Sequence, residues 1–299
     1  MSWLYFALIG YFLYAAVTIG NKYLLRQRAT TRPVVFTFWV GLMSAFTFVL
    51  APFGLHWPGW SWVAFDILTG VIYFVALLAY YRALDINEAS RAASVVGGLT
   101  PVFVLLFANF FIGEALGWQQ LAAFGFLVVG GFLISLEKKQ GEVREGIKGL
   151  KSVIATIILG AIYFVMLKYL FNQQDFITGF VWSRLGLVLA ALAALLYPLW
   201  RREIKLSWSS ATKSLGALMV GIKTLAGFGS LFVSLAVAAG SASLVNALQG
   251  AQFAFLFLFT LLLSRFWPGV CREKTNSAIF LQKSLAIILI CVGLVFVAI

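Results

Sequence analysis

The chain alternates between long apolar runs and short breaks that contain polar, glycine or proline residues. A helix that crosses a ~30 Å hydrocarbon layer needs about 20 mostly apolar residues. Ten runs meet this requirement, and they are continuously apolar, as in spanning helices. The predicted spans are Trp3–Gly20, Pro33–Ala51, Trp62–Tyr81, Ala89–Ile112, Trp118–Leu136, Ser152–Phe171, Phe176–Trp200, Leu215–Ala238, Ser241–Ser264 and Leu281–Ile299. The fold class is therefore an all-α polytopic membrane protein.

The composition agrees with a bilayer environment. Of the 299 residues, 62% are hydrophobic and 11% charged, whereas soluble domains carry about 25% charged residues. This excludes a soluble enzyme, a disordered chain and a disulfide scaffold. Cys271 and Cys291 have no acid or histidine cluster nearby, so we expect neither a metal nor another cofactor. The net charge of +12 comes from residues that interrupt apolar runs, which favours a lipid bilayer over nucleic acid as the partner.

The basic residues are distributed unevenly between the two ends of the predicted spans. The loops after the odd-numbered spans hold 19 Lys and Arg residues, with Lys283 counted among them, and the opposite side holds only Lys168. By the positive-inside rule, the basic loops lie in the cytoplasm and both termini lie outside. We therefore expect a multi-pass protein of a bacterial-type inner (plasma) membrane.

The two halves of the chain resemble each other. Lys22-Tyr23-Leu24 recurs as Lys168-Tyr169-Leu170, each after a tyrosine, Tyr14 or Tyr163, and residues 83–103 align with residues 234–254. This predicts a first five-helix repeat at 1–136, a cytoplasmic linker at 137–151 and a second repeat at 152–299. Because five is odd, tandem repeats of five spans are inverted relative to each other, and substrate sites then lie where they meet, near the bilayer midplane.

Together with the Lys-Tyr-Leu ends, three further segments resemble the drug/metabolite transporter (DMT) superfamily, of the EamA-like ten-helix type. They are Ala89-Ser90-Arg91-Ala92-Ala93, Leu99-Thr100-Pro101-Val102-Phe103 and Phe111-Ile112-Gly113-Glu114. The resemblance implies a basket of helices 1, 3, 4, 6, 8 and 9 around a central cavity that moves a small metabolite by alternating access. The second half departs from the family pattern at Gln252 and Arg265, in place of Pro101 and Glu114 equivalents. Family members usually keep both termini in the cytoplasm. The distribution of Lys and Arg residues predicts the opposite orientation here, and we base the predicted orientation on that distribution.

Two cations fall deep inside predicted spans, and a charge at mid-membrane costs about 2.5–3.5 kcal/mol on insertion scales. Lys223 lies near the centre of the eighth span and Arg184 about eight residues into the seventh. Asp66, the acid within a span, lies near an outer edge. We hypothesise that Lys223 and Arg184 attract an anionic group of the substrate; alternatively, Arg184 snorkels or binds backbone carbonyls.

The remaining candidate substrate contacts are polar and aromatic. Asn246, Gln249 and Gln252 are spaced by three residues and form one polar stripe, which contacts substrate or joins the ninth span to a neighbouring helix. Tyr14, Tyr163, Tyr73 and Tyr80 lie within spans, where their rings are candidates for stacking on a substrate. Tyr14 and Tyr163 rank first because the repeat places them symmetrically.

These features favour a secondary transporter for a small metabolite with an anionic or zwitterionic group, such as an amino acid or organic acid. One alternative is a membrane sensor or assembly subunit that does not transport. An intramembrane enzyme is the weaker alternative, because the lone histidine, His56, lies in a loop and no two acids share the membrane interior.

Overall fold

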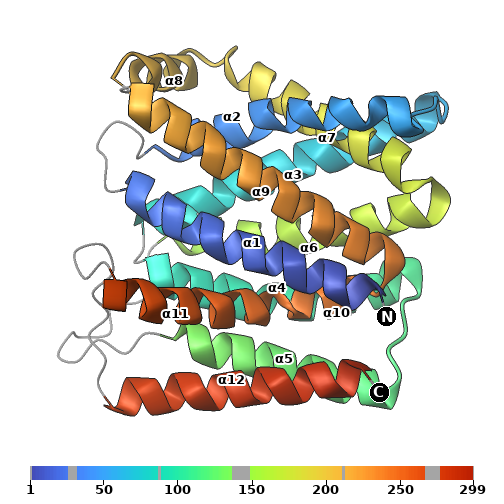
Figure 1. Ribbon diagram of the computed structural model, residues 1–299. Helices are drawn as coiled ribbons and strands as arrows, with labels where there is room; N and C mark the ends of the chain where they lie inside the picture. Colours follow the sequence, from blue (N-terminus) through green and yellow to red (C-terminus); the bar gives the residue numbers. More distant parts are fainter. Residues whose placement is uncertain are drawn as a thin grey trace.

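The computed structural model describes residues 2–25, 32–86, 89–136, 149–210, 213–266 and 277–298. All its regular elements in these ranges are helices (Figure 1). They are α1 Ser2–Leu25, α2 Pro33–Met43, the 3₁₀ helix η2 Ser44–Phe53, α3 Trp60–Ile86, α4 Ala89–Ile112, α5 Trp118–Ser135, α6 Leu150–Gln173, α7 Phe176–Ala194, α8 Pro198–Ser210, α9 Lys213–Ala239, α10 Ala242–Ala247, α11 Gln249–Phe266 and α12 Ser277–Ala298.

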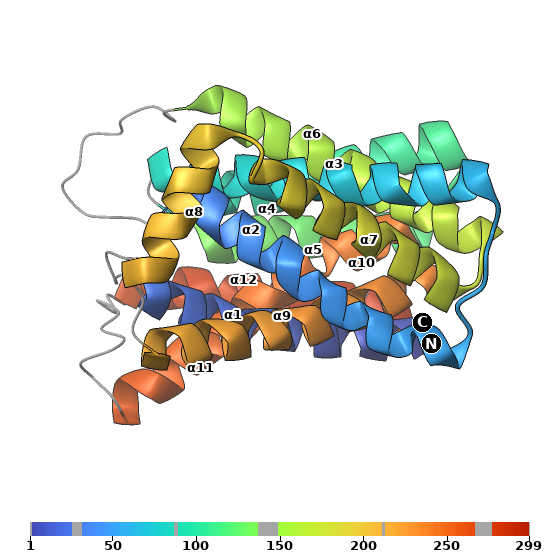
Figure 2. The same ribbon diagram turned by 90° about the horizontal axis from the view of Figure 1, so that it is seen from above.

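The helices lie side by side, and the chain crosses the bundle back and forth. Both termini lie at one end, which we call the terminal end, and α8 lies at the other, which we call the α8 end (Figures 1 and 2). Within the described residues, nine segments are long and apolar enough to span a membrane, and Leu281–Val297 is a shorter apolar helix. The prediction of an all-α polytopic membrane protein is confirmed. The predicted linker lies outside the described residues up to position 148.

Three predicted spans differ from the helices observed. The seventh span was predicted to run to Trp200, but α7 ends at Ala194 and Pro198 begins a separate helix. Proline lacks a backbone N–H and suits the first turn of a helix, so it starts α8 here. The second span continues beyond α2 as η2, a ten-residue 3₁₀ run, although such runs rarely exceed four residues.

The ninth span was predicted as one helix but is broken at Leu248, between α10 and α11. Ser241 caps the first piece, since its hydroxyl accepts a hydrogen bond from the backbone N–H of Leu244 at 3.1 Å. Backbone groups freed by a break inside a membrane are tolerated where they are buried in protein or line a cavity. The break therefore points to an internal position for this span.

Small residues allow the closest helix contacts, as is common in membrane bundles. A side chain at Gly70 of α3 would meet the backbone of Ser183 in α7, and one at Gly10 of α1 would meet Val233 of α9. Helices α5 and α12 approach each other at Gly130, which faces Ile290. These contacts place α1 against α9, α3 against α7, and α5 against α12, and α3 also packs against α6.

Candidate functional site

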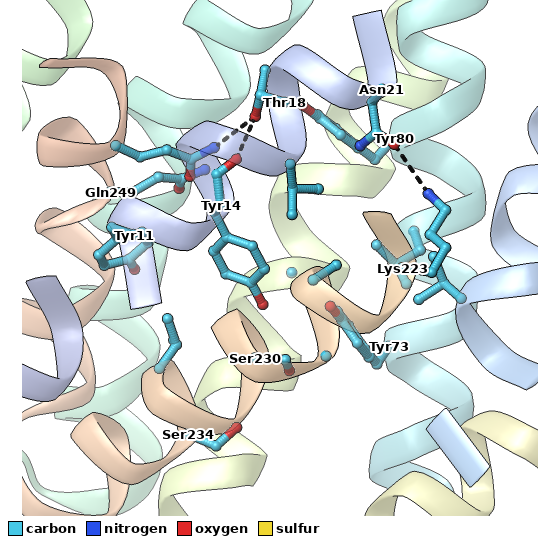
Figure 3. A pocket seen from close by; sticks show the side chains of 18 of the residues that line it. Tyr11, Tyr14, Thr18, Asn21, Tyr73, Tyr80, Lys223, Ser230, Ser234 and Gln249 are labelled. Carbon is cyan, nitrogen blue, oxygen red and sulfur yellow. Dashed lines mark hydrogen bonds between the residues drawn. The ribbon is translucent and has the colours of Figure 1, made fainter. Parts of the chain in front are cut away.

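A cavity of about 1190 Å³ lies between the two halves of the bundle (Figure 3). Its lining comes from the predicted basket helices and also from α2, η2 and α7, with two residues of α5 and one of α12. All nine predicted substrate-contact residues are part of this lining: Tyr14, Tyr73, Tyr80, Tyr163, Arg184, Lys223, Asn246, Gln249 and Gln252. The structure thus brings together residues that are up to 238 positions apart in the sequence. Their contact with a substrate stays a prediction.

Lys223 reaches the cavity from α9 and is held by polar and aromatic groups. Its ammonium donates a hydrogen bond to Asn21 Oδ1 at 3.3 Å, as Figure 3 shows. Its Nζ also lies 4.7 Å from the ring centroid of Phe36 and 5.7 Å from that of Tyr81. These rings attract a cation through their negative faces. With 4% of the residue exposed, Lys223 does not point into lipid.

Arg184 projects from α7 into a group of hydroxyls and aromatic rings. Its Nη2 donates to Ser230 at 2.7 Å, Tyr163 at 3.3 Å and Ser234 at 3.4 Å. The guanidinium carbon lies 4.6 Å from the Phe180 ring centroid, and the residue is 4% exposed. Neither snorkelling nor backbone bonding describes these contacts. All three hydroxyl contacts are neutral, so the positive charge of Arg184 is solvated but not neutralised.

The four tyrosines differ in their roles. Tyr73 and Tyr163 stack on each other, with ring centroids 4.2 Å apart and planes tilted by 14°. Tyr73 also lies beneath Arg184, 5.3 Å from ring centroid to guanidinium carbon. In Figure 3 the hydroxyl of Tyr14 points toward Ser230 of the neighbouring helix α9. The stacked pair of Tyr73 and Tyr163 therefore supports the arginine, and all four tyrosines line the cavity.

The polar stripe on the ninth span is divided by the break at Leu248. Gln252 Nε2 donates to Thr18 of α1 at 3.2 Å, which is the helix-joining interpretation of the stripe. Asn246, on the other side of the break, is 2% exposed, and its Oδ1 atom is buried without a hydrogen-bond partner. A buried acceptor without a donor is costly. Asn246 thus offers an acceptor to a group that enters the cavity.

Sequence reasoning assigned Lys283 to a loop, and this is wrong. Lys283 lies within α12, is buried and lines the cavity, with its Nζ 4.7 Å from the Phe257 ring centroid. The sequence also did not predict Asn21 as a partner of Lys223, or Ser230 and Ser234 as partners of Arg184. Lys283 lies just before the apolar run of the last span. A lysine at this position gives the same sequence pattern whether it ends the loop or lies in the first turns of the helix.

The described lining carries positive charge and no carboxylate. Arg184, Lys223 and Lys283 line the cavity, and no Asp or Glu does so among the described residues. Asp66 is buried elsewhere, where it accepts a hydrogen bond from Gln174 Nε2 at 3.1 Å. In the described part of the chain no group of three or more His, Cys, Asp and Glu residues gathers into a metal site. The arrangement suits the binding of an anion among aromatic rings.

Comparison with known proteins matches residues 1–136 to the model of the EamA-like transporter family. A curated relative from Sinorhizobium sp, called an uncharacterized transporter in the cobO 3'region, is 33% identical over 79 residues. That alignment covers 26% of this chain and 55% of the relative, so the chain spans about half the length of the relative it matches.

A solved structure, described as the crystal structure of a protein, is similar over nearly the whole chain. The two superpose with a TM-score of 0.69 at 18% sequence identity, over 99% of this chain and 96% of that chain. At this identity the likeness shows the fold alone. The family match itself is confined to residues 1–136.

Proposed function

We propose that the chain, whose residues 1–136 match the EamA-like transporter family, is a secondary transporter for a small metabolite with an anionic or zwitterionic group. An amino acid or an organic acid fits this description. The observation that carries the proposal is the pair of buried cations, Lys223 and Arg184, on one cavity without a carboxylate in its described lining.

Electrostatics explains why a bound anion stabilises these two buried cations. Each charge loses most of its hydration when it is buried, and cation–aromatic contacts return only about 0.5–2 kcal/mol. A bound carboxylate about 4 Å from one cation gains roughly 4 kcal/mol at an effective dielectric constant of 20. The substrate therefore supplies the countercharge that the described lining of the cavity lacks.

Alternating access is supported by how the helices pair. Under the proposed repeat, the first and sixth spans are equivalent, as are the third and eighth. The contact of α1 with α9 then corresponds to the contact of α6 with α3, and both contacts are present. Two inverted halves that exchange conformations open the shared cavity to one side and then to the other.

The proposal is tested by binding and uptake with purified protein. A thermal-shift panel of organic acids, amino acids and size-matched organic cations identifies ligands, and the best anion is then used for uptake into proteoliposomes. We expect anions to stabilise the protein and cations not to do so. Lys223→Ala should weaken anion binding at least tenfold, whereas Lys205→Ala, a change at an exposed lysine of α8, should leave it within twofold.

Equal anion binding by Lys223→Ala and the original protein would contradict the anion site. Binding without any uptake into sealed liposomes would instead favour the second candidate, a membrane sensor or assembly subunit. The transporter family match favours a role other than catalysis.

A further inference from the structure

The cavity has an opening whose residues can be identified from their exposure. Phe46 and Val49 of η2 line the cavity and are 62% and 68% exposed. On α9, Thr224, Gly227 and Phe228 line it and are also exposed, Phe228 by 53%. Every other described residue of the lining is buried or half-buried. The cavity therefore opens between η2 and α9.

The opening lies at the depth of the hydrocarbon layer. Thr224 to Phe228 occupy the middle of the apolar segment Gly216–Ala239, and Phe46 and Val49 lie within the apolar segment Pro33–Phe53. At about 2.0 Å per residue in a 3₁₀ helix, Phe46 is roughly 14 Å from the end of its segment. The mouth thus faces the bilayer sideways and not the water at either end.

The corresponding pair of helices in the other half is closed. By the proposed repeat, η2 with α2 corresponds to α7, and α9 corresponds to α3. Gly70 of α3 packs against the backbone of Ser183 in α7, and Gly186 of α7 packs against the backbone of Ile67 in α3. At the open mouth, by contrast, a side chain added at Gly227 would meet nothing within 4 Å. The gap is thus a specific feature of the η2 side.

We infer that the substrate is an anionic amphiphile, with a carboxylate or phosphate headgroup held at Lys223 and Arg184 and an apolar tail that lies in the mouth between η2 and α9. This inference rests on the proposed function, and it narrows the substrate class.

The chemistry of the mouth and of the interior supports this assignment. The mouth residues Phe46, Val49 and Phe228 are apolar and suit contact with alkyl chains. The interior carries the cations Lys223 and Arg184. A ligand with one charged end and one apolar end satisfies both regions together. A fully polar metabolite would leave the mouth open to lipid chains.

The test uses the full-length protein in phosphatidylcholine nanodiscs and measures the affinity for dodecanoate and dodecyl phosphate, with succinate and glycerol 3-phosphate as polar comparators. Gly227→Trp fills the mouth. Gly221→Trp is the matched control, because Gly221 lies on the same helix, has nothing within 4 Å of an added side chain and is not part of the lining. Partitioning of the tail into the bilayer is the same for both variants and cancels in their ratio.

We expect Gly227→Trp to bind the tailed anions at least tenfold more weakly than Gly221→Trp does, with succinate affinity within twofold. Val49→Trp, on the opposite edge of the mouth, should reproduce this effect if Gly227→Trp does not fold. The tailed anion that binds with the higher affinity identifies the headgroup, a carboxylate for dodecanoate or a phosphate for dodecyl phosphate.

Equal affinity of the mouth-filling and control variants for both tailed anions would overturn the inference and leave the proposed function standing. Insensitivity of dodecanoate and succinate to Lys223→Ala would overturn the proposed function and, with it, the headgroup assignment.

Discussion

The carboxylate of Glu114 receives two hydrogen bonds from Ser243, one from the backbone N–H at 3.0 Å and one from the hydroxyl at 2.6 Å. It also accepts from the hydroxyl of Ser241 and from the backbone N–H of Ala242. An acid of the first half thereby caps the first turn of α10 in the second half. A carboxylate at a helix N-terminus satisfies free N–H groups and the helix dipole.

Glu114→Gln should destabilise the protein, because the amide retains one acceptor oxygen and turns an N–H₂ group toward donors. Loss of charge-assisted bonds of this kind costs about 1.5–3 kcal/mol. We expect a lower melting temperature for the protein in detergent. Glu203→Gln is the control, since Glu203 forms a surface ion pair with Arg32, and such pairs contribute about 0–1 kcal/mol. Equal melting temperatures for the two variants would contradict the capping role.

The contact of α3 with α7 predicts that Gly70→Ala is destabilising. A methyl group there would meet the carbonyl oxygen of Ser183 and the backbone nitrogen of Leu187, and overpacking costs typically about 1–3 kcal/mol. Gly227→Ala meets open space and should not lower stability. Thermal unfolding of both variants in the same detergent measures the difference. A Gly70→Ala protein as stable as Gly227→Ala would refute the close packing.

The divided polar stripe predicts opposite results at its two ends. Gln252→Leu removes the bond to Thr18, so it should lower stability by about 0.6 kcal/mol, the average for hydrogen bonds between membrane helices, with ligand affinity within twofold. Asn246→Leu removes a buried acceptor without a partner, so it should weaken the binding of an amino acid, whose ammonium group can donate to that acceptor, severalfold at unchanged stability. Titration with the best amino acid of the thermal-shift panel and melting curves separate the two effects. The assignment fails if Gln252→Leu is the variant with the larger affinity loss.

The charge distribution predicts that the α8 end faces the cytoplasm. In a protein with Cys271 and Cys291 replaced by serine, a cysteine at exposed Lys151, near the α8 end of α6, should resist an impermeant thiol reagent in intact cells and react after permeabilisation. A cysteine at exposed Ser61, near the terminal end of α3, should react in intact cells. The reverse pattern would place both termini in the cytoplasm.

The membrane-spanning segments followed from local sequence. The span Ala89–Ile112 matches α4 at both ends, because a helix in a bilayer satisfies its own backbone and needs only sufficient apolar length. The inward position of Lys223 followed from the same physics, since a charge within a span is unstable against lipid.

Other features depend on which helices become neighbours. The contact of Glu114 with α10 brings together segments that are far apart in the chain. The separation of η2 from α9 and the break at Leu248 likewise depend on how the helices pack around the cavity. The sequence did not indicate that Lys283 is buried, because its burial depends on the neighbouring helix α11, whose Phe257 ring contacts its ammonium group. A local pattern records the length and polarity of a span, whereas side-chain partners are fixed when the helices pack together.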